Sequence, residues 1–149
     1  MSKLTIQITQ AEDAADIPLP HYQTSGAAGA DIHAAVTQDV VIEPGQIKLI
    51  PTGLSVALQG DLEVQIRPRT GLEVKSAVTV VNGPGTIDSD YRGEIKVGLI
   101  NLGDTAFTIT RGMRIAQMVI APVVQAVFEK TDHLEETQRG AAGFGSTGT

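Results

Sequence analysis

The stretch LSVALQGDLEVQIR, Leu54 to Arg67, gives the clearest indication of the fold, because it contains two runs in which apolar residues alternate with polar or small ones. The apolar positions are Leu54, Val56 and Leu58 in the first run, and Leu62, Val64 and Ile66 in the second. A period of two predicts half-buried β-strands. Gln59–Asp61, with glycine at its centre, predicts a tight turn between them. We therefore expect two short strands joined by a turn.

The same two signals recur along the rest of the chain. Alternating runs cover Leu4–Thr9 and Ile95–Leu99, and turn signals occupy Glu43–Gln46, Leu102–Asp104 and Arg111–Met113. Many short strands joined by tight turns are typical of a sandwich, a jelly roll or a barrel. The sequence thus predicts an all-β fold of the jelly-roll-like or distorted-barrel kind.

One short helix and a C-terminal tail depart from this pattern. The sequence GLEVKSA, Gly71–Ala77, is the helix candidate and allows a turn or two. From about Glu136 the periodicity is lost, and RGAAGFGSTGT, Arg139–Thr149, is rich in glycine. We expect one β domain over residues 1–135 and a flexible tail over residues 136–149.

Composition narrows the class of protein. The chain has 149 residues, of which 42% are apolar, and this suits one domain with a sizeable core. A net charge of -6 and a pI near 4.9 argue against a nucleic-acid partner. The absence of cysteine excludes disulfides and thiolate chemistry. The start MSKLTIQITQ lacks the apolar segment of a secretory signal, and no apolar run reaches the roughly 20 residues that span a bilayer. We expect a cytoplasmic protein without a membrane partner.

The stretch NGPGTIDSDYRGE, Asn82–Glu94, carries more chemical groups than a plain hairpin needs. Gly83–Gly85 turns the backbone without side-chain bulk, so a flat ligand could approach the main chain closely. Asp88 and Asp90 share a face of an extended segment, and one of them could take a proton from water. Tyr91 would then be a planar wall beside it. The alternative is a hairpin with solvated acids and a tyrosine at its rim.

Further positions allow both a functional and an ordinary structural interpretation. RPRTGLEVK, Arg67–Lys75, offers guanidinium, hydroxyl and backbone N–H groups to a phosphate, or is a basic strand end. Asp31 could help to hold a hydrated divalent cation, or could cap a turn. Gln117 is polar within an apolar strand, so it lines a site or points at solvent. Phe144 has nothing to bury against in a glycine-rich tail, so a ligand could dock against its ring.

The order of these motifs closely resembles that of the homotrimeric dUTPase family. The matching blocks are AGADI (Ala28–Ile32), RPRTGL (Arg67–Leu72), NGPGTIDSDYRGE (Asn82–Glu94), RGMRIAQ (Arg111–Gln117) and RGAAGFGSTG (Arg139–Gly148). The resemblance implies a jelly-roll-like fold that assembles as a three-fold trimer, with active sites built at subunit interfaces. It also implies hydrolysis of dUTP to dUMP and pyrophosphate with Mg²⁺, which keeps uracil out of DNA and supplies dUMP for thymidylate synthesis.

The resemblance also implies a role for each matching residue. Asp88 would activate the water that attacks the α-phosphorus. The uracil edge would be read by Asn82 and by the turn and strand that follow it, Gly85, Thr86 and Ile87, with Tyr91 beneath the deoxyribose. Arg69, Thr70, Gly71 and Gln117 would contact phosphates, and Asp31 would lie near the water shell of a Mg²⁺ held mainly by the substrate. Arg139, Phe144, Gly145, Ser146, Thr147 and Gly148 would close over the nucleotide as a lid.

The chain departs from the family pattern at three positions. Thr70 replaces the commoner serine and adds a methyl group. Glu73 replaces a small residue and would weaken substrate binding if it pointed toward the phosphates. Ala142 replaces a glycine, so the tail there must avoid positive φ. The departures remove no catalytic group.

Two other functions remain as alternatives on the same fold. A dCTP deaminase would share the architecture, but it resembles this chain poorly at the acid–tyrosine hairpin and at the tail. A non-catalytic nucleotide-binding or signalling protein would be favoured by loss of Asp88 or of the tail, and the sequence retains both.

Overall fold

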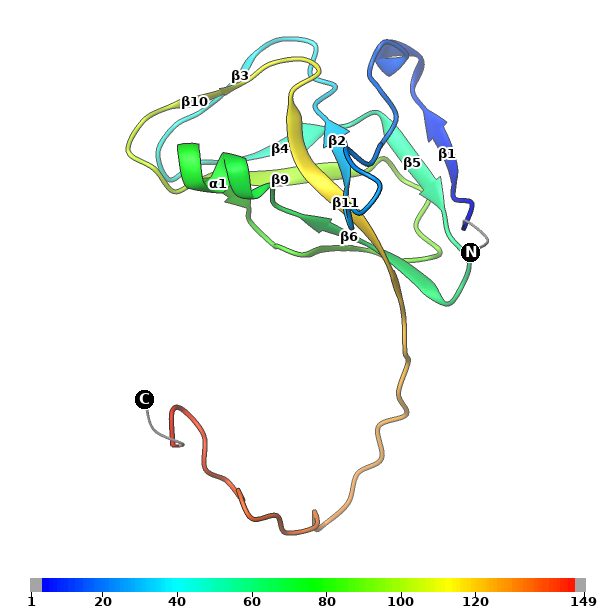
Figure 1. Ribbon diagram of the computed structural model, residues 1–149, viewed down its shortest axis with the longest axis vertical. Helices are drawn as coiled ribbons and strands as arrows, with labels where there is room; N and C mark the ends of the chain where they lie inside the picture. Colours follow the sequence, from blue (N-terminus) through cyan, green and yellow to red (C-terminus); the bar gives the residue numbers. More distant parts are fainter. Residues whose placement is uncertain (1–3, 147–149) are drawn as a thin grey trace.

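The computed structural model describes residues 4–146 and consists mainly of short strands (Figure 1). The strands are β1 Gln7–Gln10, β2 Ala30–His33, β3 Val40–Ile42, β4 Ile47–Pro51, β5 Leu54–Ala57, β6 Leu62–Arg67, β7 Val78–Val80, β8 Gly85–Ile87, β9 Lys96–Asn101, β10 Phe107–Ile109 and β11 Arg114–Pro122. The helices are a 3-10 turn, η1 Glu12–Ala14, and one α-helix, α1 Thr70–Ser76. No helix within residues 4–146 is long and apolar enough to cross a membrane.

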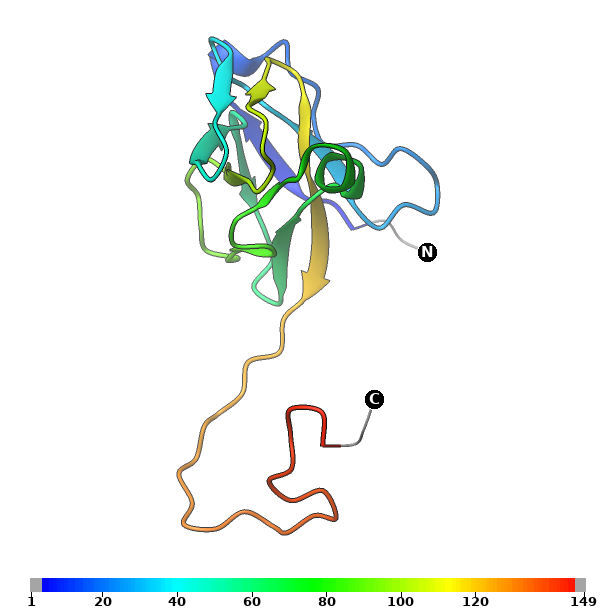
Figure 2. The same ribbon diagram turned by 90° about the vertical axis from the view of Figure 1, so that its left-hand side faces the viewer.

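The strands form four antiparallel sheets. The larger two have the orders β2-β11-β6-β8 and β4-β9-β7, and the pairs β1-β5 and β10-β3 complete the set. The predicted all-β, jelly-roll-like fold is confirmed, although none of the sheets formed by the described residues closes into a barrel. Figure 2, turned by 90°, shows these sheets wrapped around a shared interior.

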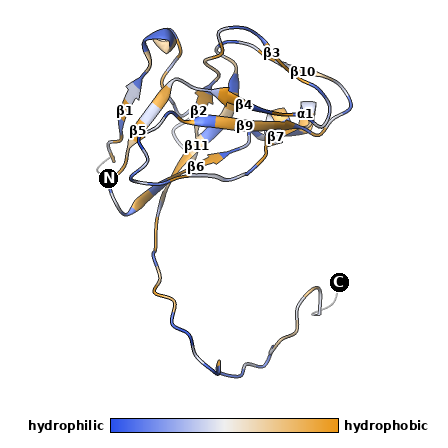
Figure 3. Ribbon diagram, turned by 180° about the vertical axis from the view of Figure 1, so that it is seen from behind, coloured by the Kyte–Doolittle hydropathy of each residue, from blue (hydrophilic) through white to orange (hydrophobic). Residues whose placement is uncertain are grey.

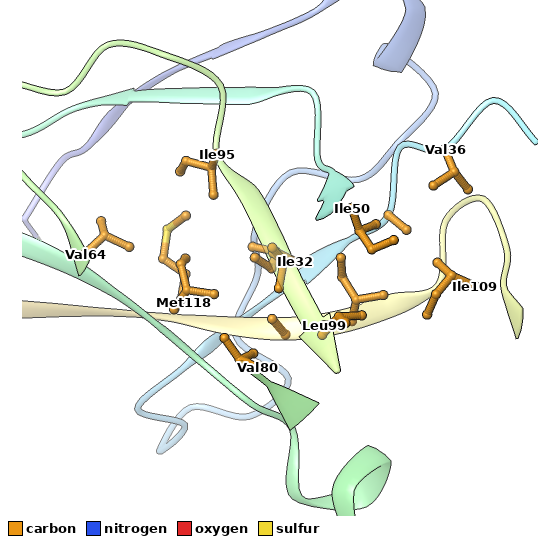
Figure 4. Packing of buried hydrophobic residues seen from close by; sticks show 14 of the residues in the cluster. Ile32, Val36, Ile50, Val64, Val80, Ile95, Leu99, Ile109 and Met118 are labelled. Atoms are coloured by element: carbon orange, nitrogen blue, oxygen red, sulfur yellow. The ribbon is translucent and has the colours of Figure 1, made fainter. Parts of the chain in front are cut away.

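The core lies between the two larger sheets. Ile32 and Met118 from the four-stranded sheet meet Leu99 and Ile50 from the three-stranded sheet, and all four are buried (Figure 4). In Figure 3 the strands carry most of the hydrophobic colour, in agreement with the predicted alternation. This burial of alternate side chains accounts for the period of two in the sequence.

The opening stretch forms two strands that belong to different sheets. β5 pairs with β1, whereas β6 pairs with β11 and β8. Both strands are nevertheless half-buried against the same core, since Val56 and Val64 are both buried in it. A period of two reports which face is buried and carries no information about the pairing partner.

The predicted helix is confirmed with a shift of one residue. α1 covers Thr70–Ser76 and ends at Ala77, whose φ of 51° is left-handed. The Ala77 N–H donates to the carbonyl of Glu73 at 2.8 Å and so closes the last turn. Glycine is the usual residue at such a C-terminal position because it has no Cβ to clash.

Replacing Ala77 by glycine is expected to stabilise the protein. The change removes the cost of holding a Cβ at positive φ, and we expect the free energy of unfolding to rise by about 1 kcal/mol. Urea denaturation would measure this change in the free energy of unfolding. Ala106→Gly, at an exposed alanine without positive φ, is the control and should lower stability slightly. Equal destabilisation by both changes would contradict the interpretation.

The chain beyond β11 leaves the folded body. Residues 123–146 contain no strand or helix and run away from the sheets in both views (Figures 1 and 2). Val124, Val127 and Phe128 are more than nine-tenths exposed. The last strand ends at Pro122, and the predicted boundary near residue 136 stays a prediction.

Candidate active site

The Asn82–Gly85 turn connects β7 to β8 and brings its polar groups close together. The Gly83 N–H donates to the Val80 carbonyl at 3.1 Å. Gly85 is buried, and a Cβ there would lie 3.3 Å from the amide nitrogen of Asn82 and 3.4 Å from Cβ of Ile66. Glycine at this position therefore lets the Asn82 side chain lie against the turn.

Asp88 lines a cavity of about 350 Å³ directly after β8. The lining residues are Leu49, Thr86, Ile87, Asp88, Tyr91, Glu94 and Lys96. Asp88 is exposed, and no hydrogen bond or ion pair engages its carboxylate within residues 4–146. A carboxylate without a protein partner can accept a proton from a bound water. Asp90, the other acid of the motif, does not line this cavity.

The Tyr91 ring is fixed at the rim of the same cavity. Its hydroxyl donates to the Glu94 carbonyl at 2.9 Å, and its N–H donates to the Asp88 carbonyl at 3.1 Å. A Cβ on Gly93 would lie 2.6 Å from Cζ of Tyr91, which is closer than any side chain permits. The position of the tyrosine ring therefore depends on glycine at residue 93.

The cavity also contains groups that the sequence interpretation missed. Glu94 accepts from the Gly53 N–H at 2.9 Å, and its other oxygen lies 3.7 Å from Nζ of Lys96. Lys96 thereby adds a positive charge to a cavity that contains the carboxylates of Asp88 and Glu94. Its sequence signal was only that of a polar residue in an alternating strand. Leu49 carried no sequence signal of a site, and only the structure shows that this apolar side chain is 64% exposed on β4.

A second group of candidate residues surrounds Asp31 on β2. Asp31 is buried, and its Oδ1 accepts from Nε of Arg69 at 3.1 Å. Its Oδ2 accepts from Nη1 of Arg114, also at 3.1 Å. A buried carboxylate shared by two guanidinium groups holds both of them in place. Asp31 thus orients Arg69, one of the predicted phosphate contacts.

Arg114 was not predicted because of a β-bulge. In a regular strand Arg114 and Gln117 would point to opposite faces, since they are three residues apart. The register between β2 and β11 shifts between Arg114 and Ala116, and Ile115 and Ala116 are both buried. The bulge lets Arg114 reach Asp31 while Gln117 stays directly opposite Asp31.

Gln117 joins this group to the Asn82 turn. It is half-buried, and its Nε2 donates to the Pro68 carbonyl at 2.9 Å. A Cβ on Gly29 would lie 2.9 Å from Cδ of Gln117, so glycine at residue 29 leaves room for the amide. A Cβ on Gly83 would contact Cδ of Pro68 at 3.5 Å. The link between β6 and α1, which contains Pro68 and Arg69, therefore lies beside the turn.

The predicted residues thus fall into two groups and a tail. The first group lies on one continuous segment, made of the turn after β7, β8 itself and the loop before β9: Asn82, Gly85, Thr86, Ile87, Asp88 and Tyr91. This segment is not a hairpin, because β7 pairs with β9 and β8 pairs with β6. In the second group Asp31, Arg69 and Gln117 lie together, with the exposed Thr70 and Gly71 next to Arg69. Within the described chain, none of the second group lines the Asp88 cavity. The structure also contains no cluster of three metal-ligating side chains within residues 4–146.

The tail residues lie apart from both groups. Arg139 donates from Nε to the Ala142 carbonyl at 2.9 Å. Phe144, Gly145 and Ser146 are all exposed. Ala142 avoids positive φ as expected, whereas Phe144 has a φ of 52°. Thr147 and Gly148 lie outside the described residues.

Arg111, at the start of the RGMRIAQ motif, has a structural role. Its Nε donates to Oδ2 of Asp16 at 3.0 Å, and its Nη1 donates to the Val36 carbonyl at 3.0 Å. The hydrogen bond from Arg111 lowers the pKa of the Asp16 carboxyl below its ordinary value of 3.8. Arg111 therefore fastens the segment after η1 to the loop that follows β2.

This ion pair predicts a pH-dependent stability difference. Because the folded state lowers the pKa of Asp16, the pair stabilises the protein above the ordinary value of 3.8 and is lost as pH falls through the lowered value. Asp16→Asn should be less stable than wild type near neutral pH, and the difference should shrink in acid. Urea midpoints across pH test this, with Asp39→Asn, at an exposed acid without an ion pair in the described chain, as control. A difference that persists or grows in acid would contradict the assignment.

The comparison with known proteins identifies the family. The dUTPase family model matches residues 15–148. The chain belongs to the dUTPase family. A relative from Roseobacter denitrificans, named deoxyuridine 5'-triphosphate nucleotidohydrolase, is 57% identical over 150 residues and covers 99% of each chain.

Solved dUTPase structures share the fold. A variant of the Staphylococcus bacteriophage 80alpha dUTPase with dUpNHpp has a TM-score of 0.87 and 23% identity, covering 99% of this chain and 100% of its own. A variant dUTPase from phage phi11 of S. aureus has a TM-score of 0.78 and 21% identity, covering 89% of this chain and 100% of its own. That structure is described as revealing the coordination of a structural Mg(II) ion. These likenesses agree with the jelly-roll-like dUTPase fold described above.

Proposed function

We propose that this chain hydrolyses dUTP to dUMP and pyrophosphate, and that Asp88 activates the attacking water. The observation that carries the proposal is an exposed carboxylate without a partner among the described residues, in a cavity beside a tight turn, in a chain of the dUTPase family. Asp88 takes a proton as the water oxygen bonds to the α-phosphorus. The bond from that phosphorus to the bridging oxygen breaks, and pyrophosphate leaves with the bond's electrons.

The base is read by the edge of the four-stranded sheet. β8, Gly85–Ile87, is the last strand in the order β2-β11-β6-β8, so its outer edge has no strand partner in the described chain. Unpaired N–H and C=O groups on such an edge, together with the Asn82 amide, can bond O4 and N3–H of uracil. Cytosine reverses the donor and the acceptor and would leave buried groups unpaired. Such a mismatch can lower kcat/KM for the wrong base by about 10⁴-fold.

The sugar lies against Tyr91 in this proposal. A ring fixed by the Glu94 carbonyl and by the glycine at residue 93 leaves no room for a 2′-hydroxyl. The cavity thereby selects a deoxyribonucleotide.

Gly93→Ala is expected to weaken this selection. The added Cβ displaces the Tyr91 ring, and a misplacement of about 1 Å can cost about 10²-fold in kcat/KM. The kcat/KM for dUTP should fall more than the kcat/KM for UTP, so the preference for dUTP over UTP decreases. Steady-state assays with both nucleotides measure it, with Gly60→Ala, at a glycine without near neighbours, as control. An unchanged ratio would refute the role of residue 93.

The triphosphate is bound by Arg69, Thr70, Gly71 and Gln117, with Asp31 holding the Arg69 guanidinium. Residues 136–149 act as a lid, in which Arg139, Gly145, Ser146 and Thr147 contact the phosphates and Phe144 stacks on the base. A guanidinium fork and hydroxyl groups suit phosphate oxygens. Asp31 keeps Arg69 in place before the substrate arrives, so less side-chain entropy is lost on binding.

Mg²⁺ is the proposed cofactor, held mainly by the substrate phosphates. Both oxygens of Asp31 already accept from guanidinium groups, so Asp31 suits a hydrogen bond to metal-bound water better than direct ligation. Mg²⁺ commonly keeps several waters and binds through phosphates with few protein ligands. When bound, the ion offsets the negative charge of the triphosphate.

A homotrimer with active sites at subunit interfaces is the proposed assembly. Ile47 and Leu49 are more than half exposed on β4, and Leu49 also lines the Asp88 cavity. A groove of about 1070 Å³ is lined, among others, by Ile6, Ile8, Leu19, Leu62, Met118 and Ile120. These surfaces and the apolar side chains of the tail favour burial against other copies.

Light scattering tests the proposed homotrimer and should give three times the 15.6 kDa chain mass. A monomer would contradict the assembly. The proposed location is the cytoplasm.

Pyrophosphate release tests the proposed function. We expect release from dUTP with Mg²⁺ and far slower release from dTTP, dCTP and UTP. Ammonia from dCTP would indicate a deaminase instead. No pyrophosphate from dUTP, with the nucleotide bound, would indicate a non-catalytic protein.

A further inference from the structure

α1 is weakly held at the place where the proposed phosphate contacts begin. It has seven residues and no buried side chain, and Val74 is 80% exposed. Only Leu72 is packed, partly, against the core. The N-terminal Arg69 makes no side-chain cap, and Ala77 ends the helix at positive φ. Helices this short are marginal unless tertiary contacts hold them.

Glu73 supplies such a contact. Its Oε1 accepts from Oγ1 of Thr79 at 2.7 Å, and both residues are half-buried. Thr79 lies in the middle of β7, opposite Ile100 of β9, and so belongs to the three-stranded sheet. The bond therefore links the middle of α1 to a strand of the core.

The same residue also organises both ends of the helix through its backbone. Its N–H donates to the Arg69 carbonyl at 3.1 Å, and its carbonyl accepts from the Ala77 N–H at 2.8 Å. Movement of Glu73 would therefore move the turn that starts at Thr70. The bond to Thr79 also keeps the carboxylate on β7, and a loose carboxylate near the phosphate contacts would repel the substrate.

We propose that Glu73 is a positioning residue, whose hydrogen bond to Thr79 fixes Thr70 and Gly71 for binding the triphosphate. The inference rests on the proposed function. It explains how a chain of this family accommodates an acid beside its phosphate contacts, because the hydrogen bond from Thr79 holds the Glu73 carboxylate at β7. A charge-assisted hydrogen bond is strong enough for its loss to raise KM about tenfold.

The test compares Glu73→Ala, Glu73→Gln and Thr79→Val. Glu73→Ala and Thr79→Val should each raise KM for dUTP about tenfold with a smaller change in kcat. Glu73→Gln keeps an acceptor oxygen and should restore most of the affinity. The double variant Glu73→Ala/Thr79→Val should lose no more than either single variant. Inhibition by deoxyuridine, which has no phosphate, should be unchanged, and Glu43→Ala at an exposed turn is the control.

Amide hydrogen exchange without nucleotide separates this inference from the proposed function. Exchange in α1 should accelerate in Glu73→Ala and stay near wild type in Glu73→Gln. An unchanged KM for dUTP in Glu73→Ala would overturn the inference, as would equal defects in the Ala and Gln variants or an equal loss of deoxyuridine binding. If wild type releases no pyrophosphate from dUTP, the proposed function fails. Amide hydrogen exchange in α1 then tests by itself whether the bond between Glu73 and Thr79 holds the helix in place.

Discussion

Asp88→Asn is expected to lower kcat for dUTP by about 10³-fold, because asparagine cannot accept the proton of the attacking water. Binding of dUTP should change little, since the side chain keeps its size and loses only its charge. The fold should be unaffected, because Asp88 is exposed and its carboxylate has no partner within residues 4–146. Steady-state pyrophosphate release and a separate measurement of dUTP affinity check both statements.

Asp90→Asn is the matched control for Asp88. Asp90 is also exposed and lies in the same motif, but it does not line the cavity. We expect its kcat to stay within a few-fold of wild type. Equal loss in the two variants would show that the motif's overall charge matters more than one base, and wild-type activity in Asp88→Asn would remove Asp88 from its role.

Removal of residues 139–149 should have the second large effect. Ordering this segment costs about 10 to 20 kcal/mol at roughly 1 to 2 kcal/mol per residue, and several charge-assisted hydrogen bonds at about 1.5 to 3 kcal/mol each offset much of that cost. The terms nearly cancel, so we expect the tail to close only when base and triphosphate are both present. We expect turnover to fall about 10²-fold or more, comparable with the loss of one donor that stabilises developing charge.

The truncated protein should remain folded. The last strand, β11, ends at Pro122, and residues 123–146 form no strand or helix. The circular dichroism spectrum and the number of subunits per particle should therefore match those of wild type. Full activity after truncation would refute the lid, whereas loss of assembly would show that residues 139–149 hold the subunits together.

Much of the fold could be predicted from periodicity and turn chemistry. The alternation in Leu54–Arg67 and Ile95–Leu99 predicted strands whose buried faces meet in one core, and Gly71–Ala77 predicted α1. The sheet partners could not be predicted, because the pairing of β5 with β1 depends on contacts distant in sequence. The strand predicted from Leu4 begins at Gln7, since end residues lack the neighbours that a ladder requires.

The candidate site was predictable where its residues are contiguous. The segment that carries Asp88 and Tyr91 was recognised as one motif, and both residues line the cavity. Lys96 and Leu49 were missed because they reach the cavity from β9 and β4, whose pairing no local pattern reveals. Arg114 was missed because a bulge changes which side of β11 it faces.

Hydrolysis of dUTP in H₂¹⁸O under single-turnover conditions tests the central claim most directly. Attack of a water activated by Asp88 at the α-phosphorus predicts that the heavy oxygen appears in the phosphate of dUMP and that pyrophosphate stays unlabelled. Label in pyrophosphate would place the attack at the β-phosphorus and would contradict the account.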